Sequence, residues 1–553
     1  MLGANYLIKV LEEHNIDTVF GYPGGAIMPV YDALVDSTIK HILCRHEQGA
    51  VFAADGYARS SGKLGVCIAT SGPGATNLLT GIANAYMDSV PLLAITGQVH
   101  SDLIGTDAFQ EIDTLGLSFP IVKHSILVKT IDELPQAIYQ AIHIAQEGRP
   151  GPVLLDITKD VQQAAITRVT VPLPVTYPST IDKENLQKVI HLIQSSDRPL
   201  FYAGGGIGLA KASSHFKALA DKLQIPIVTT LKGIGAVATT YTNNLGMLGM
   251  HGTKAANFAV QDCDLLIAVG ARFDDRATGK LAEFAPKAKV IHFDLDLAEF
   301  DKLKHATIKV TGDLNDNLQY LQQHIVGNRH HQWLHQCLEN KQQFQFKYKQ
   351  SSEQICAPSL LNRLSELLQD KPHIVSCDVG QHQMWVAQHM HFQGIENHLS
   401  SGGLGAMGYG LPAAIGAQLA NQHHQVINVS GDGSIMMNIQ ELATLVRYQI
   451  PVKILLLDNQ RLGMVRQWQQ LFFNNRYSEV DLSDNPDFSL VANAFGIRSQ
   501  SISSGLQVEN ALQRFIDSQE SYLLHVSINP QENVWPLVPP GKNNSQLIEG
   551  DSV

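Results

Sequence analysis

The clearest pattern of apolar and polar residues lies between residues 426 and 460. The apolar run at 426–429 predicts a buried strand. A turn with two glycines follows at 430–434 (SGDGS), and glycine lets a backbone approach a ligand without a Cβ in the way. The pattern therefore predicts a strand that ends in a tight turn suited to a ligand.

A helix and a second strand are predicted after this turn. Apolar residues recur at helical spacing, at Ile439, Leu442, Leu445 and Val446. Pro451 ends this pattern, and the apolar run at 452–457 predicts another buried strand that leads to Asp458 and Asn459. Strand, helix and strand make a crossover unit with two parallel strands.

The same plan occurs at 65–98, as a weak internal repeat. Its turn at 71–74 (SGPG) matches the turn at 430–433, and Pro91 stands where Pro451 stands in the later unit. The earlier turn has a proline in place of Asp432 and cannot ligate a metal in the same way. Two units of common design, one of them metal-bearing, fit a cofactor held at its two ends.

A third copy of the plan lies in the middle of the chain. Strands are predicted at 199–203, 226–230, 264–269 and 290–293, with a glycine-rich loop at 204–208. That loop lacks a clean dinucleotide fingerprint and is weak support for a nucleotide on its own. Asp294 follows the last of these strands, where it suits either a ribose hydroxyl or the cap of a helix.

These patterns predict an α/β protein with three doubly wound domains, each with a mainly parallel, six-stranded type of sheet. We expect an N-terminal domain at 1–165, a central domain at 185–325 and a C-terminal domain at 356–540. Three prolines at 172–178 indicate a linker. The Gln-, His- and Lys-rich stretch at 326–355 indicates a solvated linker or an amphipathic surface helix.

Composition narrows the class of protein. The apolar fraction of 44% and charged fraction of 16% are typical of a well-buried globular chain. A net charge of −11 argues against nucleic acid or an anionic membrane as partner. We find no signal segment and no apolar run long enough for a bilayer. Six scattered cysteines without a CxxC indicate buried thiols, so we expect a cytoplasmic protein.

Two polar residues end the strands of the 426–460 unit. Asp432 and Asn459 would meet at the carboxyl edge of the sheet, where open α/β sheets place ligands. Oxygen ligands and a helix N-terminus suit Mg²⁺ and a phosphate. The alternative is an ordinary glycine turn whose aspartate caps a helix, but Asn459 at the next strand end favours the metal.

Glu47 is the strongest candidate for acid–base chemistry. It leads from the predicted strand at 42–44 into a helix of small residues that begins at Ala50. A carboxylate in such surroundings is expected to have a raised pKa. The alternative is a first-turn glutamate that the helix dipole favours.

Several motifs together resemble the catalytic large subunits of acetohydroxyacid (acetolactate) synthases, within the thiamine-diphosphate (ThDP) enzyme superfamily. They are FGYPGGAIMPVYD, CRHEQGA, ATSGPGATN, GTDAFQE, GARFDDR, DVGQHQMW, SGDGS and DNQRLGMVRQWQQ. The resemblance covers nearly the whole chain, and the tail ENVWPLVPPG is most similar to the second bacterial isozyme.

The resemblance implies a set of cofactor residues. Glu47 is similar to the glutamate that hydrogen-bonds the aminopyrimidine of ThDP, and Mg²⁺ would be held by Asp432, Asn459 and the carbonyl of Arg461. Further ThDP contacts would come from Gly25, Val379, Gly380, Gln381, His382, Met407, Gly431, Gly433, Ser434 and Met464. The middle domain would bind FAD through Arg149, Gly204, Gly205, Gly206, His251, Gly270, Ala271, Arg272, Asp294, Gly312 and Asp313.

The resemblance also implies the reaction. Pyruvate loses CO₂, and its two-carbon fragment joins a second 2-ketoacid, either pyruvate or 2-oxobutyrate, on the way to branched-chain amino acids. Arg276 suits the carboxylate of the second ketoacid, and Trp468 and Met250 suit its extra methyl group. Lys159, Phe109 and Gln110 are similar to residues that line the substrate channel.

The resemblance also implies how the chain assembles, and two alternative functions remain to be weighed against it. The family places Glu47 and Asp432 across a subunit interface, so we expect a homodimer and a separate small regulatory subunit. One alternative is another ThDP enzyme, such as a pyruvate oxidase or decarboxylase, and Arg276 and Trp468 argue against it. Another is a catalytically inactive binding subunit, which the intact Glu47, Asp432 and Asn459 argue against.

Overall fold

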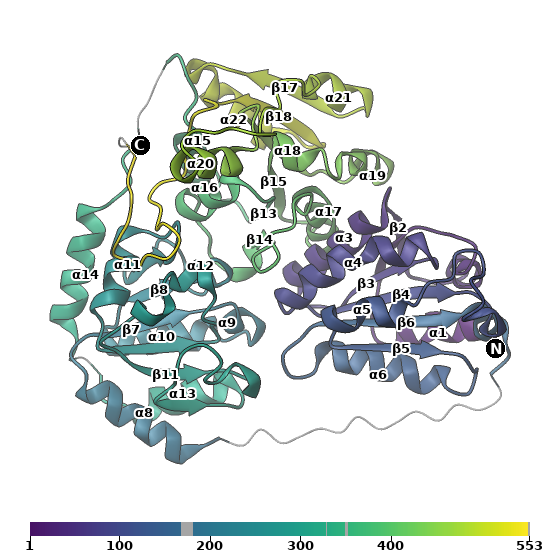
Figure 1. Ribbon diagram of the computed structural model, residues 1–553, viewed down its shortest axis with the longest axis horizontal. Helices are drawn as coiled ribbons and strands as arrows, with labels where there is room; N and C mark the ends of the chain where they lie inside the picture. The colour runs from purple at the N-terminus through teal and green to yellow at the C-terminus, as the bar shows by residue number, and fades with distance from the viewer. Residues whose placement is uncertain (167–180, 328, 349–351, 551–553) are drawn as a thin grey trace.

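The computed structural model describes residues 1–166, 181–327, 329–348 and 352–550. Each of the three parts of the chain contains one parallel sheet of six strands with helices on its faces. Figure 1 shows the N-terminal part on the right, the central part at the lower left and the C-terminal part above them. The predicted fold class is confirmed.

The first sheet has the strand order β2-β1-β3-β4-β6-β5. Its strands are β1 (Thr18–Gly21), β2 (Lys40–Leu43), β3 (Gly65–Ala69), β4 (Leu92–Gln98), β5 (His124–Val128) and β6 (Pro152–Thr158). Its helices are α1 (Gly3–Glu13), α2 (Met28–Val35), α3 (Glu47–Ser61), α4 (Pro73–Met87), α5 (Thr114–Ser118), α6 (Leu134–Gln146) and α7 (Lys159–Gln163). β3 and β4 are buried along their whole length, as two-sided coverage of a parallel sheet requires.

The second sheet has the order β12-β11-β10-β7-β8-β9. Its strands are β7 (Pro199–Ala203), β8 (Ile227–Thr229), β9 (Asn244–Met247), β10 (Leu265–Val269), β11 (Lys289–Phe293) and β12 (Ile308–Val310). Its helices are α8 (Lys183–Ser195), α9 (Gly206–Leu209), α10 (Ser213–Leu223), α11 (Lys254–Asp262), α12 (Asp275–Thr278), α13 (Leu314–His324) and α14 (His331–Gln343).

The third sheet has the order β14-β13-β15-β16-β18-β17. Its strands are β13 (His373–Cys377), β14 (His398–Ser400), β15 (Gln425–Gly431), β16 (Lys453–Asp458), β17 (Arg498–Ile502) and β18 (Tyr522–Ser527). Its helices are α15 (Ala357–Leu367), α16 (Gln381–His389), α17 (Gly410–Ala420), α18 (Asp432–Ile435), α19 (Leu442–Tyr448), α20 (Gly463–Phe472), α21 (Phe488–Ala494) and α22 (Val508–Asp517).

Helices α3 and α17 join the first and third parts face to face (Figure 1). Their contact is made of small residues, so the two backbones touch. A Cβ added to Gly56 would lie 2.2 Å from the carbonyl oxygen of Ala413, and one added to Gly416 would lie 1.8 Å from that of Ala53. Only glycine fits at these two positions.

The helix predicted after residue 434 is broken, which corrects the sequence pattern. α18 ends at Ile435, a 3₁₀ turn spans Ile439–Glu441, and α19 begins at Leu442. Asn438 leaves the helical path because its side-chain amide donates to the carbonyl oxygen of Gly408, 2.8 Å away in a distant loop. Val446, expected on the apolar face, is 41% exposed.

Two further expectations concern connections and cysteines. α14 occupies much of the 326–355 stretch and buries Trp333, so the surface-helix alternative holds there. The expected linker at 172–178 lies outside the described residues. All six cysteines are unpaired thiols, and all but Cys356 are buried. Within the described ranges, no helix has the length and apolar character needed to cross a membrane.

Candidate active site

The turn after β15 brings the backbone close to neighbouring side chains. The Ser434 hydroxyl accepts from the amide of Gly431 and donates to its carbonyl oxygen, at 3.1 and 3.2 Å. A Cβ at Gly431 would lie 2.9 Å from the His382 ring, and one at Gly433 would lie 2.9 Å from Leu462. Side chains thus pack closely against both glycines of the turn.

Asp432 and Asn459 lie at the same edge of the third sheet, because β15 and β16 pair in parallel. The Asp432 carboxylate accepts from the side chain of Asn485 at 3.3 Å. The Asn459 amide group donates to Gln381 at 3.1 Å, and its oxygen accepts from the Arg461 backbone at 3.1 Å. The two predicted strand-end residues thus lie at one sheet edge, each held by its own hydrogen-bond partners.

The electrostatics of this cluster favour a cation. Burial, and then the neighbouring Asp458 carboxylate, raise the pKa of Asp432 to about 8. Asp458 in turn lies 2.8 Å from the ring of His525. No group of three or more His, Cys, Asp or Glu side chains in the described ranges suits a metal ion. One carboxylate, one amide oxygen and a main-chain carbonyl nevertheless fit Mg²⁺, which takes few protein ligands beside phosphate oxygens.

Gln381 and His382 begin α16 beside this cluster. Gln381 donates to Gln467 at 3.1 Å and to the carbonyl oxygen of Glu532 at 2.9 Å. His382 is buried, and burial lowers its pKa to about 3. Its Nε2 atom has no hydrogen-bond partner among the described residues, as expected of a group that faces a ligand.

Met407 adjoins the same turn, and Val379 and Gly380 lead into α16. Asp378 accepts from the backbone amides of Val379, Gly408 and Gly410 at 2.8 to 3.0 Å, so it clamps the loop that carries Met407. A Cβ at Gly433 would lie 3.8 Å from the Met407 methyl group. Gly380 has a φ of +155° and precedes α16.

α20 begins directly beside the Asn459 cluster. A Cβ at Gly463 would lie 2.0 Å from the Gln381 oxygen, so the helix starts against that side chain. Met464 packs against the core of the third sheet. Further along, Trp468 makes an edge-to-face contact with Phe472, with ring centroids 5.3 Å apart.

Glu47 is the first residue of α3, in the first part of the chain. Its Oε2 accepts from the side chain of Asn77 at 3.0 Å. A Cβ at Gly74 would lie 3.4 Å from its Oε1, so the 71–74 turn adjoins the carboxylate. Gly24 packs on Thr70, whereas a Cβ at Gly25 would meet nothing within 4 Å. Open space therefore adjoins Gly25.

The loop at 101–113 carries Phe109 and Gln110. Gln110 lies against the turn of Gly72, where an added Cβ would meet it at 2.9 Å. Phe109 is 88% exposed. Lys159 begins α7, directly after β6 of the same sheet.

Arg276 and Met250 lie side by side in the central part. An Arg276 guanidinium nitrogen is 3.8 Å from the Met250 sulfur, and the Met250 backbone amide donates to the Arg276 carbonyl oxygen at 2.8 Å. The C-terminal segment packs here, since the Val538 amide donates to the Met250 carbonyl oxygen at 2.8 Å. The Arg276 side chain is 64% exposed, and its Nε lies 3.8 Å from the exposed Asp275 carboxylate.

The residues expected for FAD gather at strand ends of the second sheet. The Gly206 amide donates to the Gly270 carbonyl oxygen at 3.0 Å, which joins the loop 204–206 to the loop 270–272. Gly204 and Gly205 precede α9, and Ala271 and Arg272 follow Gly270. Asp313, which follows Gly312, caps α13 by accepting from the amide of Asp316.

Asp294 and His251 have different surroundings. Asp294 accepts from the backbone amide of Asp296 at 2.9 Å and lies 3.6 Å from the buried His292 ring. His251 lies 3.2 Å from the Pro536 carbonyl oxygen, and burial lowers its pKa to about 4. It therefore belongs to the contact between the central part and the C-terminal segment.

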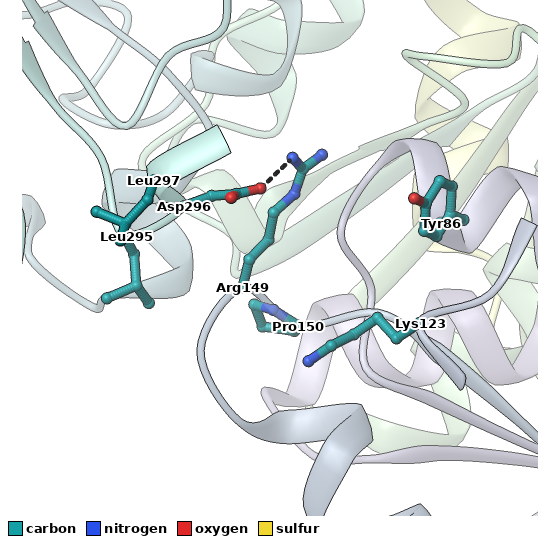
Figure 2. A pocket seen from close by; sticks show the side chains of 7 residues that line it. All are labelled: Tyr86, Lys123, Arg149, Pro150, Leu295, Asp296 and Leu297. Atoms are coloured by element: carbon teal, nitrogen blue, oxygen red, sulfur yellow. Dashed lines mark hydrogen bonds and ion pairs between the residues drawn. The ribbon is translucent and has the colours of Figure 1, made fainter. Parts of the chain in front are cut away.

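Arg149 lines a cleft of about 420 Å³ between the first and second parts (Figure 2). It donates to Asp296 at 3.1 Å and to Glu299 at 2.9 Å. The other lining residues are Tyr86, Lys123, Pro150, Leu295 and Leu297. Arg149 thus faces the loop that follows Asp294.

Several residues of the site were not expected from the sequence. Asn485, Gln467 and Glu532 reach it from distant loops or helices, and no local pattern distinguishes them. Asp378 could have been identified from the sequence, because it directly follows a buried strand, as Asp432 and Asn459 do.

Models of thiamine pyrophosphate enzymes match all three parts of the chain. The N-terminal TPP binding domain matches residues 1–117, the central domain matches 186–321 and the C-terminal TPP binding domain matches 378–526. Together with the clusters around Glu47 and Asp432, these matches define a thiamine pyrophosphate enzyme.

Relatives with full-length similarity narrow this class. The acetolactate synthase isozyme 2 large subunit of Escherichia coli K12 is 54% identical over 99% of this chain and 100% of that protein. A probable acetolactate synthase large subunit of Methanocaldococcus jannaschii is 46% identical over 99% and 95%. The isozyme 1 large subunit of Escherichia coli is 44% identical over 99% and 97%. The chain belongs to the family of acetolactate synthase large subunits, as its motifs predicted.

Proposed function

We propose that the chain catalyses the acetolactate synthase reaction, in which pyruvate loses CO₂ and its two-carbon fragment joins a second 2-ketoacid. The products are 2-acetolactate from pyruvate and 2-aceto-2-hydroxybutyrate from 2-oxobutyrate. The observation that carries this proposal is the pair of clusters around Glu47 and Asp432 in a chain of this family. When bound, thiamine diphosphate supplies the electron sink for the carbon that loses CO₂.

Mg²⁺ and the diphosphate are assigned to the cluster at the third sheet. Asp432, Asn459 and the carbonyl of Arg461 would hold the metal. The glycines of the 431–434 turn support a phosphate nearby, because they let the backbone approach it, and the unpartnered Nε2 of His382 leaves a ring nitrogen free to face a ligand.

Glu47 is assigned to proton transfer with the aminopyrimidine end of the cofactor. Asn77 occupies only its Oε2, so its Oε1 is available to share a proton. The open space at Gly25 supports a ring bound next to this carboxylate.

Arg276, Met250 and Trp468 are assigned to the second ketoacid. The exposed guanidinium of Arg276 suits its carboxylate, and the adjoining Met250 gives an apolar wall for a methyl group. Lys159, Phe109 and Gln110 would line the path to this site, and the glycine loops of the central part would hold FAD.

We also propose a homodimer in which Glu47 and Asp432 of different copies share one site, as the resemblance to the family implies. Exposed apolar residues near the 101–121 segment support an interface with a second copy. They are Leu103, Phe109, Leu117 and Phe119, which are 43%, 88%, 42% and 79% exposed. The names of the relatives support a small regulatory subunit as a further partner.

Product analysis tests the proposal. The purified chain would be incubated with Mg²⁺, thiamine diphosphate, FAD, pyruvate and 2-oxobutyrate. We expect 2-acetolactate and 2-aceto-2-hydroxybutyrate. Acetaldehyde or acetate with CO₂ would instead indicate a decarboxylase or oxidase. If no product forms even with an added small subunit, the chain is an inactive binding subunit.

A further inference from the structure

Glu441 belongs to the third part of the chain, and its fully buried carboxylate contacts the first part. It ends the 3₁₀ turn before α19. Its Oε1 accepts from the backbone amides of Arg45 and His46, at 2.8 and 3.2 Å. Its Oε2 accepts from the Thr444 hydroxyl at 2.6 Å. Both carboxylate oxygens are therefore occupied by donors.

The two amides that Glu441 binds immediately precede Glu47. His46 is the N-cap of α3, and its ring accepts from the amide of Gln48 at 3.0 Å. The peptides of Arg45 and His46 thus set the direction in which the backbone enters the helix at Glu47. A carboxylate at this helix start is favoured by the exposed amides and the helix dipole.

Gly49 shows how closely the carboxylate approaches the first turn of α3. A Cβ at this position would lie 2.4 Å from Glu441 Oε1 and 2.8 Å from its carboxyl carbon. A residue larger than glycine would push Glu441 away from the two amides. The sequence of α3 is therefore adapted to the acid that faces it.

We propose that Glu441 is a positioning residue for Glu47, which holds the start of α3 through the Arg45 and His46 amides and so fixes the direction of the Glu47 carboxylate. This inference rests on the proposed role of Glu47. The proposal also explains the broken helix after β15. Because of the break, Glu441 reaches the start of α3 from the same segment that begins with Asp432.

Tyr448 provides a matched control in the same helix. Its hydroxyl accepts from the Leu43 amide at 2.8 Å and lies 3.4 Å from the His41 carbonyl oxygen. It therefore binds the strand before α3 but not the peptides beside Glu47. Tyr448→Phe removes these two hydrogen bonds between the same two parts and leaves Glu441 in place.

Amide hydrogen exchange in the cofactor-free protein tests the contact itself. In Glu441→Ala, the Arg45 and His46 amides should exchange roughly ten-fold faster or more, because they lose their acceptor. In Tyr448→Phe, the increase should be confined to Leu43. Unchanged exchange at Arg45 and His46 in Glu441→Ala would overturn the proposal.

Exchange of the C2 proton of bound thiamine diphosphate, followed by NMR in heavy water, tests the consequence. Glu441→Ala should slow it roughly ten-fold or more, because small displacements of a reacting group are costly. Glu441→Gln keeps an acceptor oxygen and should restore most of the rate. Cofactor affinity should stay within about three-fold of the wild type in both variants.

The comparison with Glu47→Gln separates the two proposals. If Glu47→Gln and Glu441→Ala both exchange the C2 proton at the wild-type rate, the role of Glu47 fails. If Glu47→Gln is slow and Glu441→Ala is not, or if Tyr448→Phe is equally slow, the positioning role alone fails. Should Glu441→Ala not fold, Gly49→Ala displaces the carboxylate without removing it, and it should slow the exchange in the same way.

Discussion

The crossover β3–α4–β4 and the crossover from β15 to β16 begin with matching turns but continue differently. After Gly72, α4 runs without interruption for 15 residues from Pro73. After Gly431, the helix is divided into α18 of 4 residues, a 3₁₀ turn of 3 and α19 of 7. Pro73 stands at the position that Asp432 occupies in the other turn.

The same strand–helix–strand plan supports two different parts of the candidate site. In the later crossover, the break directs Asn438 to the loop of Met407 and Glu441 to the start of α3. In the earlier crossover, the unbroken helix presents Asn77 to Glu47, which comes from the preceding helix. We therefore assign metal and diphosphate to the later unit and, to the earlier one, the support of the Glu47 carboxylate through Asn77.

The largest effect is expected from Asp432→Ala, which removes the carboxylate that distinguishes the two turns. Turnover should fall roughly 10⁴-fold, because a metal contributes several kcal/mol of charge stabilisation. Titration of thiamine diphosphate at varied Mg²⁺ measures the cause. Pro73→Ala in the matching turn is the control and should keep the Mg²⁺ dependence. Metal-dependent binding that persists in Asp432→Ala would remove this residue from the metal site.

Glu47→Gln tests the proton transfer that we assign to the Glu47 carboxylate. Turnover should fall roughly 10²–10⁴-fold, as expected for loss of proton transfer, while cofactor affinity changes little. Steady-state kinetics and cofactor titration measure the two quantities. Glu13→Gln, at an exposed glutamate of α1, is the control. A wild-type turnover in Glu47→Gln would contradict the assignment.

Carboxyl groups with raised pKa values in the first and third parts of the chain should respond differently to pH. Burial raises the pKa of Glu532, beneath Gln381, from 4.5 to about 7. Since the folded-state value is the higher one, the stabilisation is complete below pH 4.5 and is lost as pH rises through 7. Glu532→Gln should therefore raise the free energy of unfolding by about 2 kcal/mol at alkaline pH and little in acid.

Asp156 is the matched carboxyl group of the first sheet, and burial raises its pKa to about 6. It accepts from Thr96 at 2.7 Å and from Gln98 at 3.0 Å. Asp156→Asn would turn an amide nitrogen toward one of these donors, so it should destabilise the protein at every pH. Denaturant unfolding at a series of pH values measures the free energy of unfolding of both variants. If the change in this free energy depended on pH in the same way for both, the predicted difference would be refuted.

The smallest effect is expected from Trp468→Leu. The ratio of products from competing 2-oxobutyrate and pyruvate should shift roughly ten-fold toward 2-acetolactate, since one methylene is worth about 1–3 kcal/mol in an apolar pocket. The rate of 2-acetolactate formation should be preserved. Phe473→Leu, at a 59% exposed neighbour, is the control. An unchanged ratio would assign the acceptor pocket to other side chains.

Buried strands were the part of the fold that the sequence predicted best. β7 has the expected bounds and β10 begins one residue later than expected, because two-sided burial leaves a continuous apolar run that local composition reveals. The broken helix could not be predicted, since Asn438 leaves the helical path for a carbonyl group in a distant loop.

Some residues of the candidate site could likewise be predicted from the sequence, and others could not. Asp432, Asn459 and Asp378 could be identified because they end buried strands at one sheet edge. Glu441 could not, since an acid in an amphipathic pattern is ordinarily solvated, and its partners are two backbone amides in another part of the chain. The positions of Arg276 and Met250 depend on a loop contact without local periodicity.

The backbone contact between α3 and α17 restricts how this protein can be engineered. Most interfaces can be tightened or loosened by exchanging side chains of different volume, but here even one methyl group at Gly56 or Gly416 would meet a carbonyl oxygen. The separation of the two helices is therefore set by the peptide chain itself. Variants that aim to change how the first and third parts of the chain are oriented must therefore carry substitutions in the segments that connect these parts. Mutant libraries should leave Gly56 and Gly416 unchanged.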